Sequence, residues 1–407
     1  MEPKIRVKGF EDGWIPSRLG IIAPLTGGYA FQSSSFTKTG IPIVRISNIL
    51  DSGVVGGEFA KYECFDNDQA FRLYNDDTVI AMSGATTGKV ATVRTENYLY
   101  QNQRVGKFSK TNKVAYQFVS TFVSSEKFAK ALNRLLTASA QPNASSKDID
   151  SIELYMPQKY EEQQTIASYF RSIDSLIQST SKKIESLKQV KAASMQSMFP
   201  QEGETAPRIR FKGFEGEWMT KPLYECLEIS KERNTEDVFG INDVLSVSDE
   251  FGVRNQIELL GRSYAGKSVS NYGILRKGQL VYTKSPLKSK PYGIVKQNTY
   301  NTGIVSVLYA IYDAKECIST EYIHYYFDPS WRLNEYLRPL VRKGAKNTMN
   351  ISDEEALSGF IQIPPTIEEQ QLIADYFTNL DSQITLQSQR LEKLKQIKSA
   401  CLDNMFV

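Results

Sequence analysis

The chain has 407 residues, with 49 Lys and Arg against 46 Asp and Glu, giving a formal net charge of +3. Its hydrophobic content of 41% and charged content of 23% are typical of a folded globular protein and exclude a disordered chain, and its length favours two domains. No run of eighteen apolar residues occurs and the first eight residues are charged, so we expect neither a membrane-spanning helix nor a secretory signal.

Residues 15–156 are predicted to form a first body of mixed α/β structure. Short apolar runs between turn signals predict strands at 41–46, 78–82 and 90–93. A helix is expected near 116–136. Because strands and helices are interspersed in this way, the fold class predicted from the sequence is mixed α+β.

The segment Ser83-Gly84-Ala85-Thr86-Thr87-Gly88-Lys89 follows the second of these strands. Its glycines permit close backbone approach, and its hydroxyl groups and lysine can contact phosphates or base edges. It is not a Walker A loop, because only three residues separate the glycines and Val90 stands where Ser or Thr is required. An ordinary glycine-containing hairpin is an equal alternative. The DNA-binding candidates of this segment are Ser83, Gly84, Thr86, Thr87 and Lys89.

A second polar segment of the first body is Gln101-Asn102-Gln103-Arg104. Amide and guanidinium groups can bond bidentately to adenine or guanine in the major groove of DNA. Gln101, Asn102 and Arg104 are therefore candidates for reading bases, and a solvated polar loop is the alternative.

Residues 157–200 have the periodicity of one long amphipathic helix. Apolar side chains recur in steps of four, three and four, which is the seam of a coiled coil. Thr180 occupies a skipped seam position, where a polar residue lowers stability but can fix the register. From residue 166 to residue 198 such a helix rises roughly 50 Å. The predicted pairing residues are Ile166, Phe170, Ile173, Ile177, Ile184 and Leu187.

A polar linker, residues 201–207, leads into a second body, residues 208–363. Strands are predicted at 279–283 and 303–308, and a helix near 321–337. Basic residues are interleaved here with aromatic and amide side chains, which is the composition used in groove binding. The DNA-binding candidates are Tyr282, Lys284, Lys288, Lys290 and Tyr292 in one cluster and Arg342, Lys343, Lys346 and Asn347 in another.

The last segment, residues 364–407, repeats the first long helix. Pro157–Phe170 returns as Pro364–Phe377 at an offset of 207 residues, and Met198-Phe199 returns as Met405-Phe406. The corresponding pairing residues are Ile373, Phe377, Leu380, Ile384, Leu391 and Leu394. We therefore expect two matched helices that pack on each other as a rigid spacer, and the alternative is a helix buried against each domain.

The two halves also open alike. Arg6–Glu11 with Trp14 returns as Arg210–Glu215 with Trp218 at an offset of 204 residues, whereas the bodies between the matched segments differ strongly. Matched parts indicate one mechanical task performed twice, and divergent bodies indicate two different recognition tasks. A duplication that drifted without any division of function is the alternative.

Motifs for catalysis and for metal binding are missing. We find no Asn/Asp-Pro-Pro-aromatic motif of amino-methyltransferases, no G-x-G-x-x-G loop and no nuclease pattern. The single histidine, His324, lies in an apolar stretch and is expected to be packed. Because the cysteines are far apart in sequence, no metal site is expected, and reduced, buried cysteines in a cytoplasmic protein are the simplest interpretation. The cysteines are Cys64, Cys226, Cys317 and Cys401.

Over essentially its whole length the chain resembles the specificity subunit of type I restriction-modification systems. The resemblance is carried by the paired Pro-x-x-x-Glu-Glu-Gln-Gln-x-Ile-Ala-x-Tyr-Phe segments at 157–170 and 364–377, each followed by a long helix. The opening motifs near Trp14 and Trp218 and the strand and loop from Met82 to Lys89 fit the same family.

The resemblance implies a division into five segments: a first target recognition domain (1–156), a central conserved spacer helix (157–200), a linker (201–207), a second target recognition domain (208–363) and a distal conserved spacer helix (364–407). The two helices would pack antiparallel between the domains, with a pseudo-twofold internal repeat. Each domain would read one half of a bipartite target in double-stranded DNA.

The resemblance also implies partners. Two methyltransferase subunits would dock on the helical regions, flip out adenine and transfer a methyl group from S-adenosylmethionine, and restriction subunits would add ATP- and Mg-dependent cleavage. The chain itself would bind no cofactor and no metal and would supply no catalytic residue. A coiled-coil scaffold that joins two proteins without reading DNA, and a stand-alone restriction or methylation enzyme, are the competing hypotheses.

Overall fold

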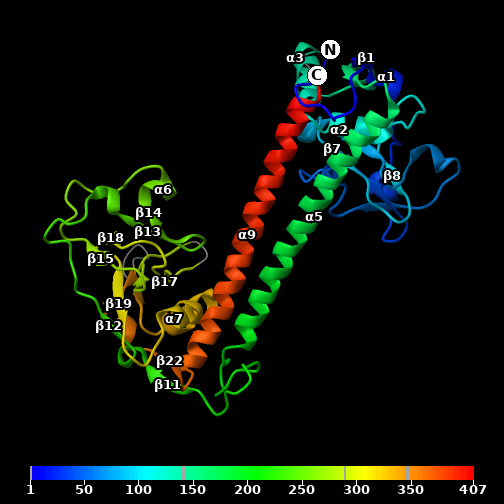
Figure 1. Cartoon of the computed structure of the whole chain (residues 1–407). Coiled ribbons are helices and arrows are strands. Elements are labelled where there is room, and N and C mark those ends of the chain that lie inside the picture. Colours follow the sequence, from blue (N-terminus) through cyan, green and yellow to red (C-terminus); the bar gives the residue numbers. More distant parts are fainter. Residues whose placement is uncertain (1, 140–142, 288–289, 344–348) are drawn as a thin grey trace. The chain divides into compact units, whose positions relative to one another are not determined.

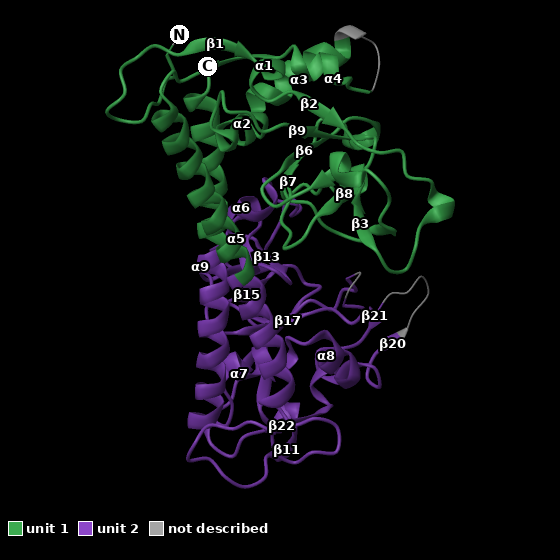
Figure 2. Ribbon diagram, turned by 90° about the vertical axis from the view of Figure 1, so that its right-hand side faces the viewer, with its two compact units in different colours: residues 1–182, 388–407 green, residues 183–387 purple. Residues whose placement is uncertain are grey.

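The computed structural model describes residues 2–139, 143–287, 290–343 and 349–407, which form helices and strands in two compact units (Figures 1 and 2). Unit 1 comprises Met1–Lys182 and Ser388–Val407, and unit 2 comprises Lys183–Gln387. Each unit therefore contains one divergent body and a part of each long helix. The expected mixed α+β class is confirmed.

Unit 1 contains two four-stranded sheets and one strand pair. The first sheet has the order β2-β9-β6-β7 and the second the order β4-β3-β8-β5, with β3 and β8 parallel. The antiparallel pair β1 and β10 joins the start of the body to its end. The strands are β1 (Ile15–Arg18), β2 (Leu25–Gly27), β3 (Ile41–Val44), β4 (Ala60–Tyr62), β5 (Arg72–Leu73), β6 (Thr78–Ala81), β7 (Val90–Thr92), β8 (Leu99–Gln101), β9 (Val105–Phe108) and β10 (Glu153–Met156).

Unit 2 contains a four-stranded sheet of the order β12-β19-β16-β17 and several strand pairs, β11-β22, β13-β14, β15-β18 and β20-β21. Its strands are β11 (Met219–Pro222), β12 (Leu227–Ile229), β13 (Leu245–Ser248), β14 (Gly252–Asn255), β15 (Gly273–Leu275), β16 (Leu280–Tyr282), β17 (Val295–Gln297), β18 (Gly303–Val305), β19 (Ala310–Ala314), β20 (Arg342–Lys343), β21 (Met349–Asn350) and β22 (Phe360–Ile363).

Each divergent body contains a four-stranded sheet with an equivalent strand order. The orders β2-β9-β6-β7 and β12-β19-β16-β17 are equivalent, and every neighbouring pair in both is antiparallel. The β6–β7 hairpin of unit 1 therefore corresponds to the β16–β17 hairpin of unit 2. The sequence predicted three of these strands, β6, β7 and β16, but it did not show that the two hairpins are equivalent.

Both bodies carry a broken helix where the sequence predicts a continuous one. In unit 1, α2 (Tyr116–Val123) is followed by α3 (Glu126–Ser139), and in unit 2, α7 (Thr320–Phe327) is followed by α8 (Ser330–Leu337). The break in unit 1 is stabilised by the Ser125 hydroxyl, which accepts from the amide of Phe128 at 3.3 Å. In unit 2, Pro329 precedes α8 and cannot continue a helix. The short helices are α1 (Leu19–Ile22), α4 (Ser146–Asp150) and α6 (Gln256–Leu260).

The two longest helices are α5 (Tyr160–Ser197) and α9 (Ile367–Met405), of 38 and 39 residues. They pair antiparallel within each unit. In unit 1, Asp174 and Lys398 form an ion pair at 2.6 Å, and in unit 2, Lys191 and Asp381 form one at 2.8 Å. These pairs are equivalent in the repeat, because both residues are displaced by 207 positions.

None of the helices in the described part of the chain combines the length and apolarity needed to cross a membrane. The five-segment division implied by the family resemblance follows the sequence repeat, whereas the compact units divide both long helices at residues 182–183 and 387–388. The division by role in the repeat stays a prediction.

Candidate nucleic-acid interface

The β6–β7 loop of unit 1 is a compact turn. Ser83 precedes a short 3₁₀ turn, Gly84–Thr86, and Gly84 and Gly88 have φ of +78° and +87°. Only glycine adopts such angles without strain, so both glycines are required by the turn itself. At Gly88 a Cβ atom would also lie 3.1 Å from the Leu132 side chain. The hairpin therefore requires both glycines, and close approach of DNA to this loop stays a prediction.

Beside this loop lies a hollow of about 460 Å³. Its lining residues are Met82, Ser83, Gly84, Gln103, Arg104, Asn143 and Ala144. The hydroxyl oxygens of Ser83 and Thr86 are enclosed and have no hydrogen-bond partner among the described residues. Such a group costs about 1–3 kcal/mol when unsatisfied. Arg104 is exposed and forms no ion pair with any described residue, so this edge of unit 1 offers a cation.

Other candidates of the first body already have partners within the protein, at its surface or in its interior. The Lys89 ammonium pairs with Asp51 at 2.5 Å, and the Thr87 hydroxyl donates to the Gly84 carbonyl at 2.7 Å. Gln101 is fully buried, and its amide donates to two backbone carbonyls at 2.7 and 2.8 Å. Asn102 is 9% exposed and accepts from the Arg104 amide at 3.2 Å. A base-reading surface in this conformation therefore does not include Gln101, because strand β8 directs its side chain into the body.

In unit 2 the first basic cluster lies on the β16–β17 hairpin, and most of its side chains are engaged. Tyr282 is 1% exposed and donates to the Tyr292 carbonyl at 2.8 Å. Lys284 pairs with Asp353 at 2.5 Å, and Lys290 is 8% exposed and pairs with Asp249 at 2.7 Å. The sequence pattern of lysines and tyrosines is real, but tertiary contacts direct these groups into the protein. Tyr292 is half-buried against the core.

The second basic cluster is only partly described. The Arg342 side chain is 84% exposed and lies 3.8 Å from Glu355, which is a weak surface pair. Lys343 belongs to strand β20, and its side chain is not described. Lys288, Lys346 and Asn347 lie outside the described residues. Among the side chains of this cluster that the structure describes, Arg342 is therefore the exposed cation.

The repeated Glu-Glu-Gln-Gln motif attaches each long helix to its body. In unit 1 the Arg6 guanidinium donates to both oxygens of Glu162 at 2.8 and 2.9 Å, and in unit 2 Arg210 donates to Glu369 at 2.6 and 2.8 Å. Both carboxylates are buried, and a hydrogen bond from Arg6 to buried Glu162 raises the pKa of Arg6. The opening segments and the helices are thus repeated because they form this bidentate pair.

The glutamine after that glutamate has an equally exact role. Gln163 accepts from the amide of Ala115 at 2.8 Å, and Gln370 accepts from the amide of Ser319 at 2.9 Å. Ala115 and Ser319 are the residues before α2 and α7. Each long helix therefore fixes the start of the broken helix in its body, at α2 in unit 1 and at α7 in unit 2. The sequence signalled these roles only through the repeat, because the partners are distant along the chain.

The predicted pairing residues lie along α5 and α9, and those in the first turns of each helix are buried in the core of a unit. Further along, Ile184 is buried as well, and the others are half-buried. Phe406 stacks on Phe170 with ring centroids 6.5 Å apart, and Phe199 stacks on Phe377 at 5.8 Å. The end of each helix is thus buried at the start of the other. The buried residues are Ile166, Phe170, Ile173, Ile184, Ile373, Phe377 and Leu380, and the half-buried ones are Ile177, Leu187, Ile384, Leu391 and Leu394.

Comparison with known protein families gives one decisive match. The family described as type I restriction modification DNA specificity domain matches residues 11–189 and 270–396. The chain belongs to this family. The match has two blocks, one in each half of the chain, so the type I specificity fold contains two recognition domains here.

Two curated members of the type I specificity family align with parts of the chain. The MjaVIII specificity subunit of Methanocaldococcus jannaschii is 27% identical over 202 residues, which cover 47% of this chain and 47% of that protein. The EcoBI specificity subunit of Escherichia coli is 24% identical over 181 residues, which cover 44% of this chain and 36% of that protein. The aligned segments thus span less than half the length of either relative.

A solved structure has the same fold. The S subunit of the type I restriction-modification system from M. genitalium aligns with a TM-score of 0.65 and 12% sequence identity, covering 100% of this chain and 99% of that one. Low identity with full coverage means that the specificity fold is retained while most side chains differ. Individual DNA contacts therefore have to be argued from the side chains of this chain.

One surface segment of this specificity protein was missed by the sequence analysis. Tyr264 is 60% exposed, and the Arg262 guanidinium lies 4.6 Å from the centre of its ring. Lys267 follows on the same loop and is exposed. The available signal was the alternation of basic and aromatic residues in 262–267. Among the described residues, no group of His, Cys, Asp and Glu is arranged to hold a metal ion.

Proposed function

We propose that this chain is the non-catalytic, sequence-reading subunit of a type I restriction-modification complex, with one half of a bipartite DNA target read by each unit. The family match supports the DNA-specificity role. The observation that carries the division of labour is the pair of equivalent hairpins, β6–β7 and β16–β17, which share a sheet order and differ in sequence. Recognition of two different half-sites is consistent with a common sheet that carries two hairpins of different sequence.

The DNA contacts proposed for unit 1 are centred on the hollow beside the β6–β7 loop. Arg104 supplies an exposed cation, and Ser83 and Gly84 line the same hollow. For unit 2 the exposed groups are Arg342 together with Arg262, Tyr264 and Lys267. The buried lysines of the β16–β17 hairpin act through the shape of the hairpin. Exposed cations contact phosphates, and base edges are read by the loops that the phosphate contacts hold in place.

The proposal includes the partners of the family. Two methyltransferase subunits dock on the repeated helical regions and methylate adenine at N6, and the helix pair sets the unread gap between the half-sites. S-adenosylmethionine, ATP and Mg belong to the methyltransferase and restriction subunits, and this chain binds no cofactor. Methylation of the genome places the complex in a bacterial or archaeal cytoplasm.

The proposed function is tested by methylome mapping. The chain is co-expressed with its cognate methyltransferase subunit in a host free of adenine methylation, and modified adenines are located by sequencing. We expect one bipartite motif of two short half-sites around a fixed gap. No new methylation, with a methyltransferase that is active on another specificity subunit, would favour a protein-joining scaffold that does not read DNA.

A variant separates phosphate contact from base reading at the hollow. Arg104→Ala should weaken DNA binding of the complex similarly for all sequences and reduce the salt dependence by about one counterion if Arg104 contacts a phosphate. Relaxed specificity at one base pair would instead assign it to a base edge. Arg18→Ala is the matched control, because Arg18 is an exposed arginine whose surface pair with Glu153 lies outside the hollow.

A further inference from the structure

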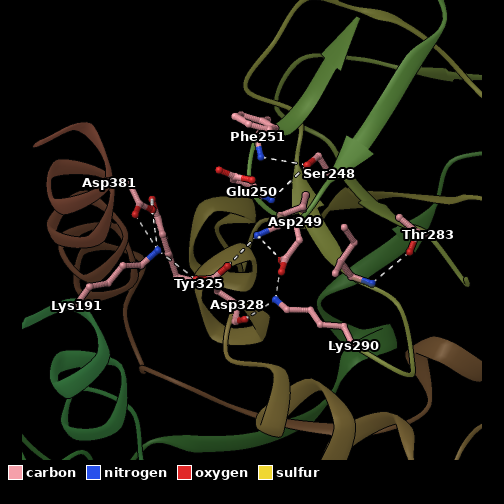
Figure 3. A network of polar contacts seen from close by, with 12 residues as sticks. Lys191, Ser248, Asp249, Glu250, Phe251, Thr283, Lys290, Tyr325, Asp328 and Asp381 are labelled. Atoms are coloured by element: carbon pink, nitrogen blue, oxygen red, sulfur yellow. Dashed lines mark hydrogen bonds and ion pairs between the residues drawn. The ribbon is translucent and has the colours of Figure 1, made fainter. Parts of the chain in front are cut away.

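Unit 2 contains a continuous network of ion pairs that joins the β16–β17 hairpin to the long helices (Figure 3). Lys191 on α5 contacts Asp381 on α9 at 2.8 Å and Asp328 at 3.2 Å. Asp328 pairs with Lys296 on β17 at 2.8 Å. The helix pair is therefore connected to strand β17 through two consecutive ion pairs.

The network continues into the hairpin loop and a neighbouring turn. Lys290 donates to the Asp328 carbonyl at 3.0 Å and pairs with Asp249 at 2.7 Å, and Asp249 also lies 3.6 Å from Lys296. Asp249 belongs to the turn between β13 and β14. Three lysines and three aspartates take part, so their formal charges cancel. The members are Lys191, Lys290, Lys296, Asp249, Asp328 and Asp381.

Burial makes these contacts specific. The Lys290 and Lys296 side chains are 10% and 6% exposed, so neither ammonium group can turn to water without moving the hairpin. Asp328 follows the C-terminal end of α7, where the helix dipole disfavours a negative charge. Burial opposes its ionisation, but the charges of Lys296 and Lys191 outweigh burial and hold the pKa of Asp328 well below its usual range. The carboxylate therefore depends on both lysines.

The ends of the hairpin loop are fixed as well. Lys284 has a φ of +47°, which is unusual for a residue with a side chain, and its ammonium is held by Asp353. Gly293 has a φ of +83°, and a Cβ atom there would lie 2.9 Å from the Thr283 hydroxyl. The hairpin thus has one preferred conformation at both ends. The ion-pair network then links this hairpin to the long helices.

Unit 1 has the equivalent ion pair between the two long helices. Among its described residues it lacks the extension, meaning the further ion pairs through Asp328 that link the helices to the hairpin in unit 2. Lys398 and Asp174 are the repeat equivalents of Lys191 and Asp381. The residue nine positions after Ala115, which corresponds to Asp328 nine positions after Ser319, is the exposed Ser124. The described ion pair of the β6–β7 loop connects Lys89 to Asp51, and neither residue lies on a long helix. The extension is therefore a property of unit 2.

We propose that Lys191 and Asp328 are positioning residues for DNA recognition by unit 2, which tie the β16–β17 hairpin to the helix pair α5 and α9. They touch no DNA themselves and act through the hairpin. The inference rests on the proposed function, because it concerns the half-site that unit 2 reads. The same residues would also set the orientation of the hairpin relative to the helices on which the methyltransferase docks.

The test uses the full chain in complex with its methyltransferase. Lys191→Met removes the link, Lys191→Arg keeps the charge, and Lys398→Met is the matched control in unit 1. For Lys191→Met we expect roughly tenfold poorer discrimination between matched and mismatched DNA at one half-site and unchanged discrimination at the other. Lys191→Arg should restore most of it, and Lys398→Met should change neither half-site.

A second readout does not depend on DNA. Hydrogen exchange should become at least several-fold faster in segments 248–251, 283–287 and 290–294 of Lys191→Met, with no change in unit 1. If Lys191→Met fails to fold, Asp249→Asn replaces it, because that carboxylate is 38% exposed and its loss opens the hairpin side of the network. The same half-site should then be affected, to a smaller extent.

The outcomes separate the two proposals. A wild-type complex without a bipartite motif overturns the proposed function, and the exchange measurement still tests the link. A wild-type motif that Lys191→Met or Asp249→Asn reads as accurately as before, with unchanged exchange in the hairpin, overturns the positioning role. Equal loss at both half-sites also contradicts it, since that result indicates a general loss of structure.

Discussion

The two units use the same attachment of body to helix and differ in how the β6–β7 and β16–β17 hairpins are held. Arg6–Glu162 and Arg210–Glu369 are equivalent, as are the glutamine contacts and the stacked phenylalanine pairs. The ion-pair extension through Asp328 occurs in unit 2, where unit 1 has Ser124. Repetition is thus retained where a body meets the helices, and divergence occurs around the hairpins that we propose contact DNA.

The largest effect is expected at the shared stacked pair. Phe199 and Phe406 are buried at 0% and 1% exposure, and Phe→Ala at such sites costs about 3–5 kcal/mol. Because the positions are equivalent, Phe199→Ala should destabilise unit 2 about as much as Phe406→Ala destabilises unit 1. Denaturant unfolding followed by hydrogen exchange in each unit measures both. Unequal losses of more than about 2 kcal/mol would show that the two ends are not equivalent.

A slightly smaller effect is expected at the bidentate pairs. Glu162→Gln or Glu369→Gln leaves a largely buried arginine without its counter-charge, and breaking a buried pair costs about 3–5 kcal/mol before the remaining amide bond is counted. We expect about 3 kcal/mol in each unit, measured by denaturant midpoint at constant slope. Glu161→Gln is the control, since Glu161 is exposed and forms no described pair.

A smaller effect is expected when the pH falls, because the stability of unit 2 should then decrease more than that of unit 1. Burial, with help from Lys296 and Lys191 and against Asp328, lowers the pKa of His324 to about 3 in the folded state. The unfolded imidazole has a pKa near 6.5, so between about pH 6.5 and pH 3 the unfolded state binds more protons and stability falls as pH falls. At pH 5.5 this amounts to about 1.4 kcal/mol for unit 2.

The matching position in unit 1 is Ser120, which does not titrate in this range. Acidification from pH 7 to pH 5.5 should therefore destabilise unit 2 more than unit 1, and His324→Gln should remove most of the difference. Hydrogen exchange in the two units at both pH values provides the measurement. Parallel loss in both units would mean that His324 is protonated in the folded protein.

The sequence predicted the parts of this fold that depend on local patterns. The seams of α5 and α9 and the strand at 78–82 can be predicted from periodicity, because the responsible residues are neighbours along the chain. The repeat can be found by matching the two halves of the sequence. The ion-pair partners of Lys290 and Lys296 could not be predicted from the sequence. Their partners, Asp249 and Asp328, are 41 and 32 positions away, and only the tertiary structure brings them together.

The same limit applies to the candidate interface. Gln101 has the chemistry of a base-reading residue, but strand β8 places it in the interior, and alternation along a three-residue strand is too short to fix which face is buried. Arg104, three residues later, lies beyond the strand and is exposed. Composition therefore placed the candidates of unit 1 within a few residues of one another, and backbone direction decided which of them are exposed.

The smallest effect is expected at the two tryptophans of the opening segments. Trp14 and Trp218 are equally buried, but the Trp14 indole donates to Glu162 at 3.3 Å, whereas the Trp218 indole nitrogen has no partner among the described residues. Replacement by Phe removes similar volume in both units and a hydrogen bond only in unit 1, so Trp14→Phe should cost about 1 kcal/mol more than Trp218→Phe. Denaturant unfolding of both variants gives the difference directly. Equal costs would mean that the Trp14 bond contributes nothing beyond packing, and that the opening segments are as equivalent in energy as they are in sequence.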